Sequence, residues 1–162
     1  MKTYDDAVTS FREGMAHLCT PVSVITAFDG DRPHGTTVSA IMSLSMHPPM
    51  VAVALDRNSQ LLDVIQRSHR FGVNILAGGQ SDLGVTFARK GDDKFADVDW
   101  NLEDQLPRLA GATGWLACYV AQVDEGGDHL LLQGAVLNTA TEVSSPLTYF
   151  ARSFGTHKPC AS

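Results

Sequence analysis

The amino-acid sequence predicts a mainly β protein, a closed or partly closed barrel of roughly five or six mostly antiparallel strands with about two or three short peripheral helices. Short apolar segments recur along the chain, and turns containing glycine, proline or aspartate separate them. Apolar residues at helical spacing occur in only a few stretches. There is no internal repeat, and a chain of 162 residues can bury one core, so we expect a single domain over residues 1–162.

The composition argues against several classes of protein. The net charge of −6 disfavours binding to a nucleic-acid backbone, and no apolar run is long enough to span a membrane. The acidic N-terminal segment is unlike a signal peptide. The three cysteines are far apart, which is typical of free thiols in the cytoplasm, and Cys118 falls inside a predicted strand, where we expect it to be buried. None of the six histidines pairs at metal-ligand spacing, so we expect no metal site.

The N-terminal elements are a helix and a strand. Residues 4–18 have apolar positions at helical spacing and acidic residues in the first turn. The apolar positions are Val8, Phe11, Met15 and Leu18. Pro21 ends the helix, residues 22–28 form a strand, and residues 29–31, Asp-Gly-Asp, form a turn. The turn leads into residues 35–46, which we interpret as the next strand.

Residues 35–46 combine the two-residue period of a strand with a complete absence of charged side chains. One face carries mostly hydroxyl groups, on Thr37, Ser39, Ile41, Ser43 and Ser45. The other face is apolar and carries Val38, Ala40, Met42, Leu44 and Met46. Neutral hydroxyl groups suit a sheltered groove that binds a flat polar ligand. A solvated Ser/Thr face on an antiparallel sheet is the alternative, and the pattern alone does not separate the two.

A second candidate site lies at residues 56–59, Asp-Arg-Asn-Ser, between an apolar strand and a helix. The strand covers residues 50–55, and the helix, capped by Asn58 or Ser59, continues to Arg67. Its expected buried residues are Leu61, Leu62, Val64 and Ile65. A helix start with hydroxyl, amide and arginine donors can hold a phosphate. A plain capped turn is the alternative interpretation.

The second half of the chain continues with strands and one more helix. We expect a strand over residues 71–76 and a helix that begins at Ser81. The residues expected to face inward from this helix are Leu83, Phe87 and Ala88. Residues 91–107 are predicted to be irregular. Their expected anchors are Phe95, Val98 and Trp100.

The last predicted elements form a hairpin followed by an aromatic tail. Two strands, over residues 115–123 and 129–139, are joined by the glycine-containing segment 124–128. His129 follows that segment directly. A lone histidine at a hairpin is usually an ordinary surface residue, and only its neighbours make it a functional candidate. The tail after Pro146 holds Tyr149, Phe150 and Phe154.

Five motifs occur in the same order and at similar spacing as in one known family. They are G-T-T-V-S-A-I-M-S-L-S-M-H-P-P over 35–49, F-G-V-N-I-L over 71–76, K-F-x-x-V-x-W over 94–100, G-D-H over 127–129 and P-L-x-Y-F over 146–150. With them the chain resembles the flavin reductase family, the small reductase components of two-component flavin-dependent monooxygenases. Thr36, Ile41 and His47 depart from the residues common in that family. The Arg152-Ser153-Phe154 ending also departs from the family's Arg-Tyr, so no role for Arg152 follows from the resemblance.

The resemblance implies a split β-barrel of the FMN-binding type, Greek-key-like, and a cytoplasmic homodimer with flavin near the subunit interface. It implies hydride transfer from NADH or NADPH to FMN or FAD, and diffusion of reduced flavin to a separate monooxygenase component. His129 is carried over as the residue on the nicotinamide side, where it places the cofactor or stabilises charge on the reduced flavin. The implied cofactor-binding residues are Thr37, Val38, Ser39, Ala40, Ser45, Asp56, Arg57, Asn58, Ser59, Phe87 and Arg89.

Two other functions stay open on the sequence alone. A non-catalytic flavin-binding protein, for storage or sensing, could use the same split barrel. A ligand-free barrel that serves as an interaction module is disfavoured by the neutral hydroxyl face. Neither nucleic acid nor a membrane is expected as a partner.

Overall fold

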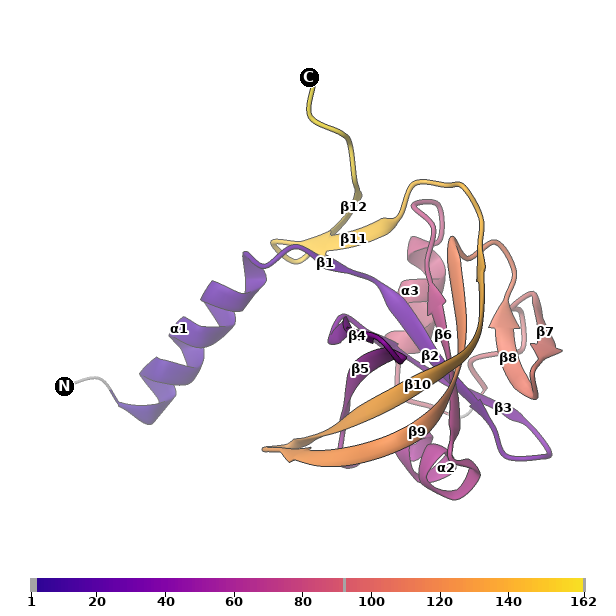
Figure 1. Ribbon diagram of the computed structural model, residues 1–162. Helices are drawn as coiled ribbons and strands as arrows, with labels where there is room; N and C mark the ends of the chain where they lie inside the picture. The colour runs from indigo at the N-terminus through magenta and orange to yellow at the C-terminus, as the bar shows by residue number, and fades with distance from the viewer. Residues whose placement is uncertain (1–2, 92, 162) are drawn as a thin grey trace.

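The computed structural model describes residues 3–91 and 93–161. Its centre is a seven-stranded sheet in the order β3-β2-β6-β9-β10-β5-β4, in which all neighbours are antiparallel. The strands span Ser23–Phe28 (β2), Pro33–Val38 (β3), Ile41–Met46 (β4), Pro49–Asp56 (β5), Arg70–Ile75 (β6), Gly114–Gly126 (β9) and His129–Thr141 (β10). The sheet curls (Figure 1), but within the described residues its edge strands β3 and β4 do not pair. The predicted split barrel is therefore confirmed.

The predicted strand over residues 35–46 is wrong in one respect, because the structure divides it into β3 and β4. Ser39 and Ala40 join the two strands, and the Ile41 N–H donates to the Ser39 carbonyl over 3.1 Å, which turns the chain. The strands then lie on opposite edges of the sheet, β3 beside β2 and β4 beside β5. A two-residue period cannot reveal this division, since each half keeps the period after its pairing partner changes.

The main core fills the inside of the curled sheet and includes one face of α2 (Gln60–Ser68). The four residues expected on that face are buried, namely Leu61, Leu62, Val64 and Ile65. They belong to one cluster with Ile25 of β2, Phe71 of β6 and Leu132 of β10. The end of α2 is sharp, because His69 adopts a left-handed conformation with φ of 55° and donates its N–H to the Ile65 carbonyl.

A smaller core lies under α3 (Ser81–Ala88). Phe87 is fully buried there and meets Phe95 edge-to-face at a ring-centroid distance of 4.8 Å, and Phe95 meets Trp100 at 5.6 Å. The expected anchoring by Phe95 and Trp100 is confirmed. Two details are wrong: Gln80, not Ser81, is the N-cap, and Ala88 is exposed because it ends the helix.

Residues 91–107 were expected to be irregular, but part of this segment forms a hairpin. β7 (Trp100–Glu103) pairs with β8 (Leu106–Leu109). Asp104 and Gln105 form the turn with φ of 51° and 64°. Positive φ at both turn residues is typical of a type I′ turn, which usually contains glycine or asparagine. The segment lacks that signal, so its sequence did not indicate the turn.

β9 and β10 form one long hairpin, and its turn is tighter than predicted. The strands reach Gly126 and His129, so only Gly127 and Asp128 connect them, and the predicted connection over 124–128 is wrong at its start. Gly127 has φ of 69°, which a glycine adopts at little cost. The C-terminal tail forms a second small sheet, in which β1 (Thr20–Pro21) and β12 (Ser153–Thr156) flank β11 (Leu147–Phe150).

The helix α1 (Tyr4–Ala16) extends away from the barrel (Figure 1). Its N-terminus has a capping box, in which the Asp6 N–H donates to the Thr3 hydroxyl and the Thr3 N–H donates to the Asp6 carboxylate. The predicted helix is therefore present, but it ends at Ala16 with His17 as its C-cap, before the predicted end at residue 18. Within Tyr4–Ala16, however, no residue is buried against this chain, so its apolar face is left open. Over the described part of the chain, no helix has both the length and the apolarity to cross a membrane.

Candidate functional site

Two neighbouring cavities adjoin β3. The first, which we call the apolar cavity, has a volume of about 510 Å³. It is lined by Val22, Thr37, Val38, Ser39, Gly84, Val85, Ala88, Arg89, Tyr149, Arg152 and Phe154. The second, which we call the charged cavity, has a volume of about 750 Å³. It is lined by Pro33, His34, Gly35, Thr36, Asp56, Asn58, Ser59, Gln60, Leu61, Ala88, Arg89, Lys90, Gly91, Lys94 and Phe95. Ala88 and Arg89 line both, so the two cavities meet at the end of α3.

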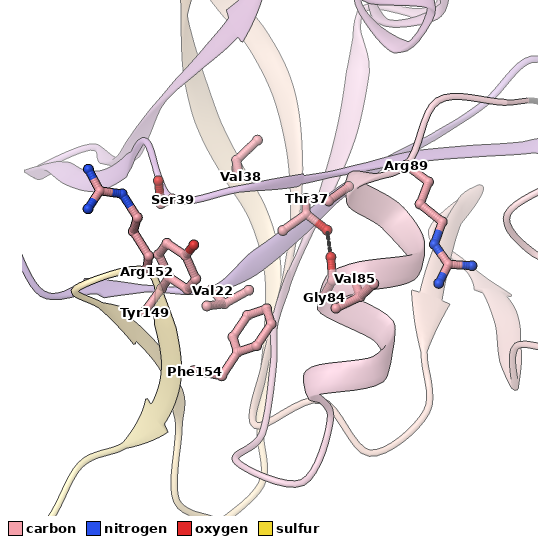
Figure 2. Close-up of a pocket in the computed structure, with 11 residues that line it drawn as sticks. Val22, Thr37, Val38, Ser39, Gly84, Val85, Arg89, Tyr149, Arg152 and Phe154 are labelled. Carbon is pink, nitrogen blue, oxygen red and sulfur yellow. Dashed lines mark hydrogen bonds between the residues drawn. The ribbon is translucent and has the colours of Figure 1, made fainter. Parts of the chain in front are cut away.

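Three elements form the walls of the apolar cavity: β3, α3 and the C-terminal hairpin β11–β12 (Figure 2). Phe154 lies beside α3 and Tyr149 lies nearer Arg152, with their rings edge-to-face at a centroid distance of 5.3 Å. Gly84 provides the opposite wall, where an added Cβ would lie 3.3 Å from the Phe154 ring. The absence of a side chain at Gly84 therefore lets the Phe154 ring approach the helix closely.

The hydroxyl groups of the predicted polar face do not all serve one groove. The Thr37 hydroxyl donates to the Gly84 carbonyl over 2.7 Å and ties β3 to α3 (Figure 2). Ser39 lines the apolar cavity at its far end from Arg89. Ser43 and Ser45 lie on β4, at the opposite edge of the sheet. The hydroxyl-bearing face predicted from the sequence is therefore divided at the β3–β4 junction.

Two arginines mark opposite ends of the apolar cavity (Figure 2). Arg89 follows the last residue of α3. Arg152 lies in the β11–β12 turn with φ of 62°, and its guanidinium pairs with Glu13 of α1. The hydrogen bond from Arg152 lowers the pKa of Glu13, so the carboxylate stays charged in the pair. This pair connects the outlying helix to the rim of the cavity.

The charged cavity lies between the start of α2 and the segment after α3. Asp56 organises the turn, because its carboxylate accepts the Asn58 N–H over 2.8 Å and its carbonyl accepts the Ser59 N–H over 3.0 Å. Ser59 is the N-cap of α2, yet its side chain makes no capping hydrogen bond within the described residues. On the opposite side lie the cationic side chains of Arg89, Lys90 and Lys94.

His34 adds a titratable group to the charged cavity. Its Nε2 lies 2.8 Å from a carboxylate oxygen of Asp29. The Arg32 N–H, the His34 side chain and the Asp31 N–H all stabilise the Asp29 carboxylate, which holds its pKa well below the usual range. The turn before β3 therefore presents an anchored imidazole toward the cavity.

Seven of the twelve predicted site residues line the two cavities. Thr37, Val38 and Ser39 line the apolar cavity. Asp56, Asn58 and Ser59 line the charged cavity, and Arg89 lines both. The other five line neither cavity of this single chain: Ala40, Ser45, Arg57, Phe87 and His129. Phe87 lies behind Gly35, where an added Cβ would be 2.9 Å from its ring.

His129 and Arg57 lie together beside the charged cavity. His129 is the pairing partner of Asp56 in the sheet, and its Nδ1 lies 2.7 Å from the Asp128 carboxylate. The Arg57 Nε–H donates to the Gly127 carbonyl over 2.7 Å, and the Arg57 N–H donates to the Asp128 carbonyl over 3.1 Å. The Gly-Asp-His turn and the Asp-Arg-Asn-Ser segment thus form one connected unit. A functional role for His129 stays a prediction.

Several lining residues were not among the predicted site residues. The polar, aromatic and glycine residues among them include Thr36, Gln60, Lys90, His34, Gly84, Lys94, Tyr149, Arg152 and Phe154. Lys94 belongs to the K-F motif and Tyr149 to the P-L-x-Y-F motif, so both carried a signal. Gly84 had none, because a helical glycine becomes a cavity wall only through its contact with Phe154.

Other chemistry finds no support at these cavities. Cys118 is buried in β9, and burial raises the pKa of its thiol to about 12, so it is a structural residue as expected. Over residues 3–91 and 93–161, no group of three His, Cys, Asp or Glu side chains could hold a metal ion.

Comparison with known proteins gives consistent matches. A family model described as a flavin reductase like domain matches residues 15–158. The reductase component of 4-nitrophenol 4-monooxygenase/4-nitrocatechol 2-monooxygenase from Rhodococcus opacus is 37% identical, over 92% of this chain and 80% of that protein. The flavin reductase (NADH) of Kitasatospora aureofaciens is 35% identical, over 90% of this chain and 79% of that protein.

Solved structures also match this chain over nearly its whole length. Component B of nitrilotriacetate monooxygenase from Mycobacterium thermoresistibile superposes with a TM-score of 0.92 at 28% identity, over 97% of this chain and 90% of that chain. The NADH:FAD oxidoreductase SgcE6 of Streptomyces globisporus, solved with NAD and FAD fragments, superposes with a TM-score of 0.91 at 27% identity, over 100% of this chain and 99% of that chain.

Proposed function

Because this chain belongs to the flavin reductase family, we propose that it transfers a hydride from NADH to FMN or FAD and supplies the reduced flavin to a separate monooxygenase. The family match over residues 15–158 carries this proposal, and it confirms the resemblance predicted from the five motifs. NADH is favoured over NADPH because relatives at 35% and 31% identity are named as NADH enzymes. A monooxygenase partner is favoured because other relatives are named as reductase components of monooxygenases.

The two cavities fit the two chemically different parts of a phosphorylated flavin. An isoalloxazine ring needs a flat, mostly apolar slot with a few neutral donors. The apolar cavity offers one between β3, Val85 of α3 and Phe154, with Ser39 at its end. A phosphate needs cations and hydrogen-bond donors, and the charged cavity is lined by both, with the cations on the segment after α3 and the Ser59 hydroxyl at the start of α2. We therefore assign the ring to the apolar cavity and the phosphate to the charged cavity.

This assignment gives the chain's residues positioning roles. Bound flavin supplies the hydride acceptor, so the protein needs neither a nucleophile nor a metal. Thr37 holds β3 against α3 through the Gly84 carbonyl and so keeps the width of the slot constant. Tyr149 and Phe154 line one side of it with an edge-to-face aromatic pair. Such placement of two reactants accounts for much of the rate in hydride transfer.

We propose that His129 acts from the rim, beside Asp56. Its place in the Gly-Asp-His turn supports this role, because Arg57 connects that turn to residues 56–59, three of which line the charged cavity. The Asp128 carboxylate sits against Nδ1 and orients the ring, which leaves Nε2 for a bound nicotinamide or flavin. His129 would place the nicotinamide or stabilise charge, with no obligatory proton transfer.

The test of the activity is direct. Purified protein is mixed with NADH or NADPH and excess FMN or FAD, and the loss of nicotinamide absorbance is followed. Oxidation well above the rate without protein, and faster with NADH, is the expected result. If neither nicotinamide is oxidised with either flavin, the enzyme proposal fails, and measurable flavin binding in the same sample would identify a storage or sensing protein.

Release of the product is part of the proposal. A reductase that feeds a separate oxygenase must let reduced flavin leave, so tight binding would limit its turnover. We expect the protein to purify without colour and to bind flavin reversibly. A preparation that keeps one flavin per chain through extensive dialysis would contradict delivery by diffusion.

We further propose that the chain is a homodimer. A compact monomer of 17.4 kDa exposes roughly 7,900 Å², whereas this chain exposes 9745 Å². The excess of roughly 1,900 Å² is more than one partner buries in a standard interface. Exposed apolar side chains follow α1 and β4, among them Phe11 (67%), Met42 (55%) and Met46 (72%). A second copy that covers these surfaces accounts for both observations.

The oligomeric state can be measured by size exclusion with light scattering. We expect about twice 17.4 kDa for the wild type and a lighter species for the Met42→Glu, Met46→Glu double variant. The matched control is Val143→Glu, since Val143 is a fully exposed apolar residue in the loop before β11. The assigned interface would be contradicted if the wild type is a monomer. It would also be contradicted if Val143→Glu lowers the measured mass as much as the Met42→Glu, Met46→Glu double variant does.

A further inference from the structure

The C-terminal hairpin β11–β12 is anchored differently at its two ends. Its base enters the barrel, where Leu147 is buried and forms backbone hydrogen bonds with Val22 and Leu76. Its tip, residues 150–153, is exposed. The tip carries Arg152, which lines the apolar cavity at the end opposite Arg89 (Figure 2). The position of the tip therefore affects one wall of that cavity.

The end of α1 holds the tip of the hairpin. The Ala151 N–H donates to the Ala16 carbonyl over 2.7 Å. The Arg152 guanidinium pairs with the Glu13 carboxylate, and the His17 ring meets an aromatic ring of the tip edge-to-face at a centroid distance of 6.0 Å. Apart from the pairing within the hairpin, these are the contacts that hold the tip in the part of the chain that the structure describes.

The turn at the tip has a backbone conformation that its residues do not favour. Ala151 and Arg152 have positive φ, of 48° and 62°. A side chain with a Cβ disfavours this left-handed region, and two-residue turns of this kind usually contain glycine or asparagine. A costly conformation persists where its surroundings compensate for the cost. The contacts with Ala16 and Glu13 supply that compensation, so the tip and the end of α1 form one unit.

A connection to α1 restrains the cavity wall only if α1 is itself held in place. Within Tyr4–Ala16 no residue is buried against this chain, and Phe11 and Met15 are 67% and 45% exposed. The homodimer proposed above would cover this face, since the chain exposes roughly 1,900 Å² more than a compact monomer of its mass. A second copy would then hold α1, and the tip of the hairpin with it.

We propose that α1 positions the wall of the apolar cavity through the ion pair between Glu13 and Arg152, once a second copy covers the apolar face of the helix. This inference rests on the proposed function, which assigns the flavin ring to that cavity and a second copy to α1. Glu13 lines neither cavity, so it acts on the flavin through Arg152 and is a positioning residue. Direct contact between Arg152 and the flavin is the alternative.

The experiment is a double-mutant cycle on the dissociation constant of FMN, measured by flavin fluorescence. Glu13→Gln and Arg152→Gln should each weaken FMN binding about two- to fivefold, the range for an exposed ion pair. The double variant should be no weaker than either single variant, because both remove the same interaction. Riboflavin should lose the same factor, since it carries the same ring. Unchanged FMN affinity in Glu13→Gln would overturn the proposal, and a loss in Arg152→Gln alone would indicate direct contact.

Arg152→Gly separates positioning of the cavity wall from a purely structural role in the turn. Glycine adopts a φ of 62° at little cost, so this variant should melt at no lower temperature than Arg152→Gln. It lacks the guanidinium, however, and should show the same loss of FMN affinity as Glu13→Gln. Wild-type FMN affinity in Arg152→Gly would overturn the proposal, because the conformation of the turn alone would then determine binding.

Two further variants test the specificity of the effect and the covering of α1. Glu142→Gln is the matched control, because Glu142 is a similarly exposed glutamate that pairs with Arg108, and neither residue lines the two cavities. Its FMN affinity should equal that of the wild type, and a loss as large as in Glu13→Gln would overturn the proposal.

Phe11→Glu should lower the mass measured by light scattering and weaken FMN binding as Glu13→Gln does, because α1 would lose its cover. Either an unchanged mass or an unchanged FMN affinity in Phe11→Glu would overturn the proposal. No binding of any flavin by the wild type would instead overturn the proposed function.

Discussion

The apolar and charged cavities differ in how they are built, although they meet at Ala88 and Arg89. The apolar cavity is enclosed by side chains from three segments that lie far apart in the sequence: β3, α3 and the C-terminal hairpin. The charged cavity depends on polar groups in two short stretches, at 56–60 and 88–95, together with the start of β3. Under the proposed assignment, the apolar cavity would bind the flavin ring by its shape and the charged cavity would bind the phosphate by its charge.

The largest effect is expected from filling the apolar cavity. Gly84→Leu places a branched side chain where even a Cβ would lie 3.3 Å from Phe154. The side chain would occupy the slot assigned to the ring, so we expect kcat/KM for flavin to fall at least about 100-fold. Riboflavin and FMN should lose affinity equally, because both carry the ring. Fluorescence titration and steady-state kinetics measure the two quantities.

A matched control for this variant is Gly79→Leu, since an added Cβ at Gly79 meets nothing within 4 Å. Its activity should be close to that of the wild type. A helical leucine restores about 1 kcal/mol of helix propensity relative to glycine, so thermal unfolding should show that Gly84→Leu remains folded. Normal flavin affinity in Gly84→Leu would place the ring elsewhere.

The next effect concerns His129, which lies beside the charged cavity without lining it. His129→Ala should leave flavin affinity nearly intact and lower the rate of flavin reduction by about 10- to 100-fold, because a shift of around 1 Å in placement can cost that much. Stopped-flow reduction at several NADH concentrations, beside a flavin titration, measures both. Unchanged kinetics would make His129 an ordinary hairpin residue, and weakened flavin binding alone would move it to the flavin site.

A smaller effect tests the divided hydroxyl face. Ser39 lines the apolar cavity, so Ser39→Leu should weaken flavin binding by about tenfold through crowding of its end. The sequence predicts a similar effect for Ser45→Leu, but Ser45 lies on β4 and lines neither cavity of a single chain. Weaker flavin binding in Ser39→Leu alone would indicate a site formed within one chain. Weaker flavin binding in both variants would indicate that β4, and so a dimer partner, contributes to the site.

The smallest effect is expected at the rim of the charged cavity. The Asp29 pKa is lowered in the folded chain, first by the Arg32 N–H and then by His34. A carboxylate with a lowered pKa stabilises the fold above its unfolded pKa of about 3.9 and loses that contribution as the pH falls further. In Asp29→Asn, the free energy of unfolding should therefore fall less steeply as the pH drops below about 4. At pH 7 the substitution should lower that free energy by no more than about 1 kcal/mol.

Urea unfolding at several pH values checks this, with Asp31→Asn in the same turn as the control. Riboflavin affinity should not change in either variant, because the apolar cavity does not include this turn. An unchanged acid limb in Asp29→Asn would show that the carboxylate contributes nothing to the pH dependence of folding.

The sequence predicts local features of this molecule well and distant pairings poorly. The buried face of α2 follows from four apolar residues at helical spacing, and the polar turn at residues 56–59 follows from one tetrapeptide before that helix. Both depend on neighbours within about one turn, which a sequence displays directly. The division of residues 35–46 between two sheet edges depends on pairing with β2 and β5, which no local pattern encodes.

The same distinction explains the site residues. Asp56, Asn58 and Ser59 could be predicted together, because they stand together. Gly84 and Phe154 are 70 positions apart and meet only when the C-terminal hairpin packs beside α3. Phe87 lines neither cavity because its ring lies behind Gly35, and its burial was predicted. The open face of α1 was not predicted either, since helical periodicity shows a face but not what covers it.

The junction at Ser39 and Ala40 has a consequence for folding. β3 and β4 are adjacent in the sequence, yet five other strands separate them in the sheet. Their relative position is therefore set only when the whole sheet has assembled, including the distant pairing of β5 with β10. A partly folded chain cannot present this junction to a ligand. Ligand binding here should raise the stability of the entire sheet in one cooperative step, by about 2.7 kcal/mol at a hundredfold excess over Kd, rather than protect a local segment.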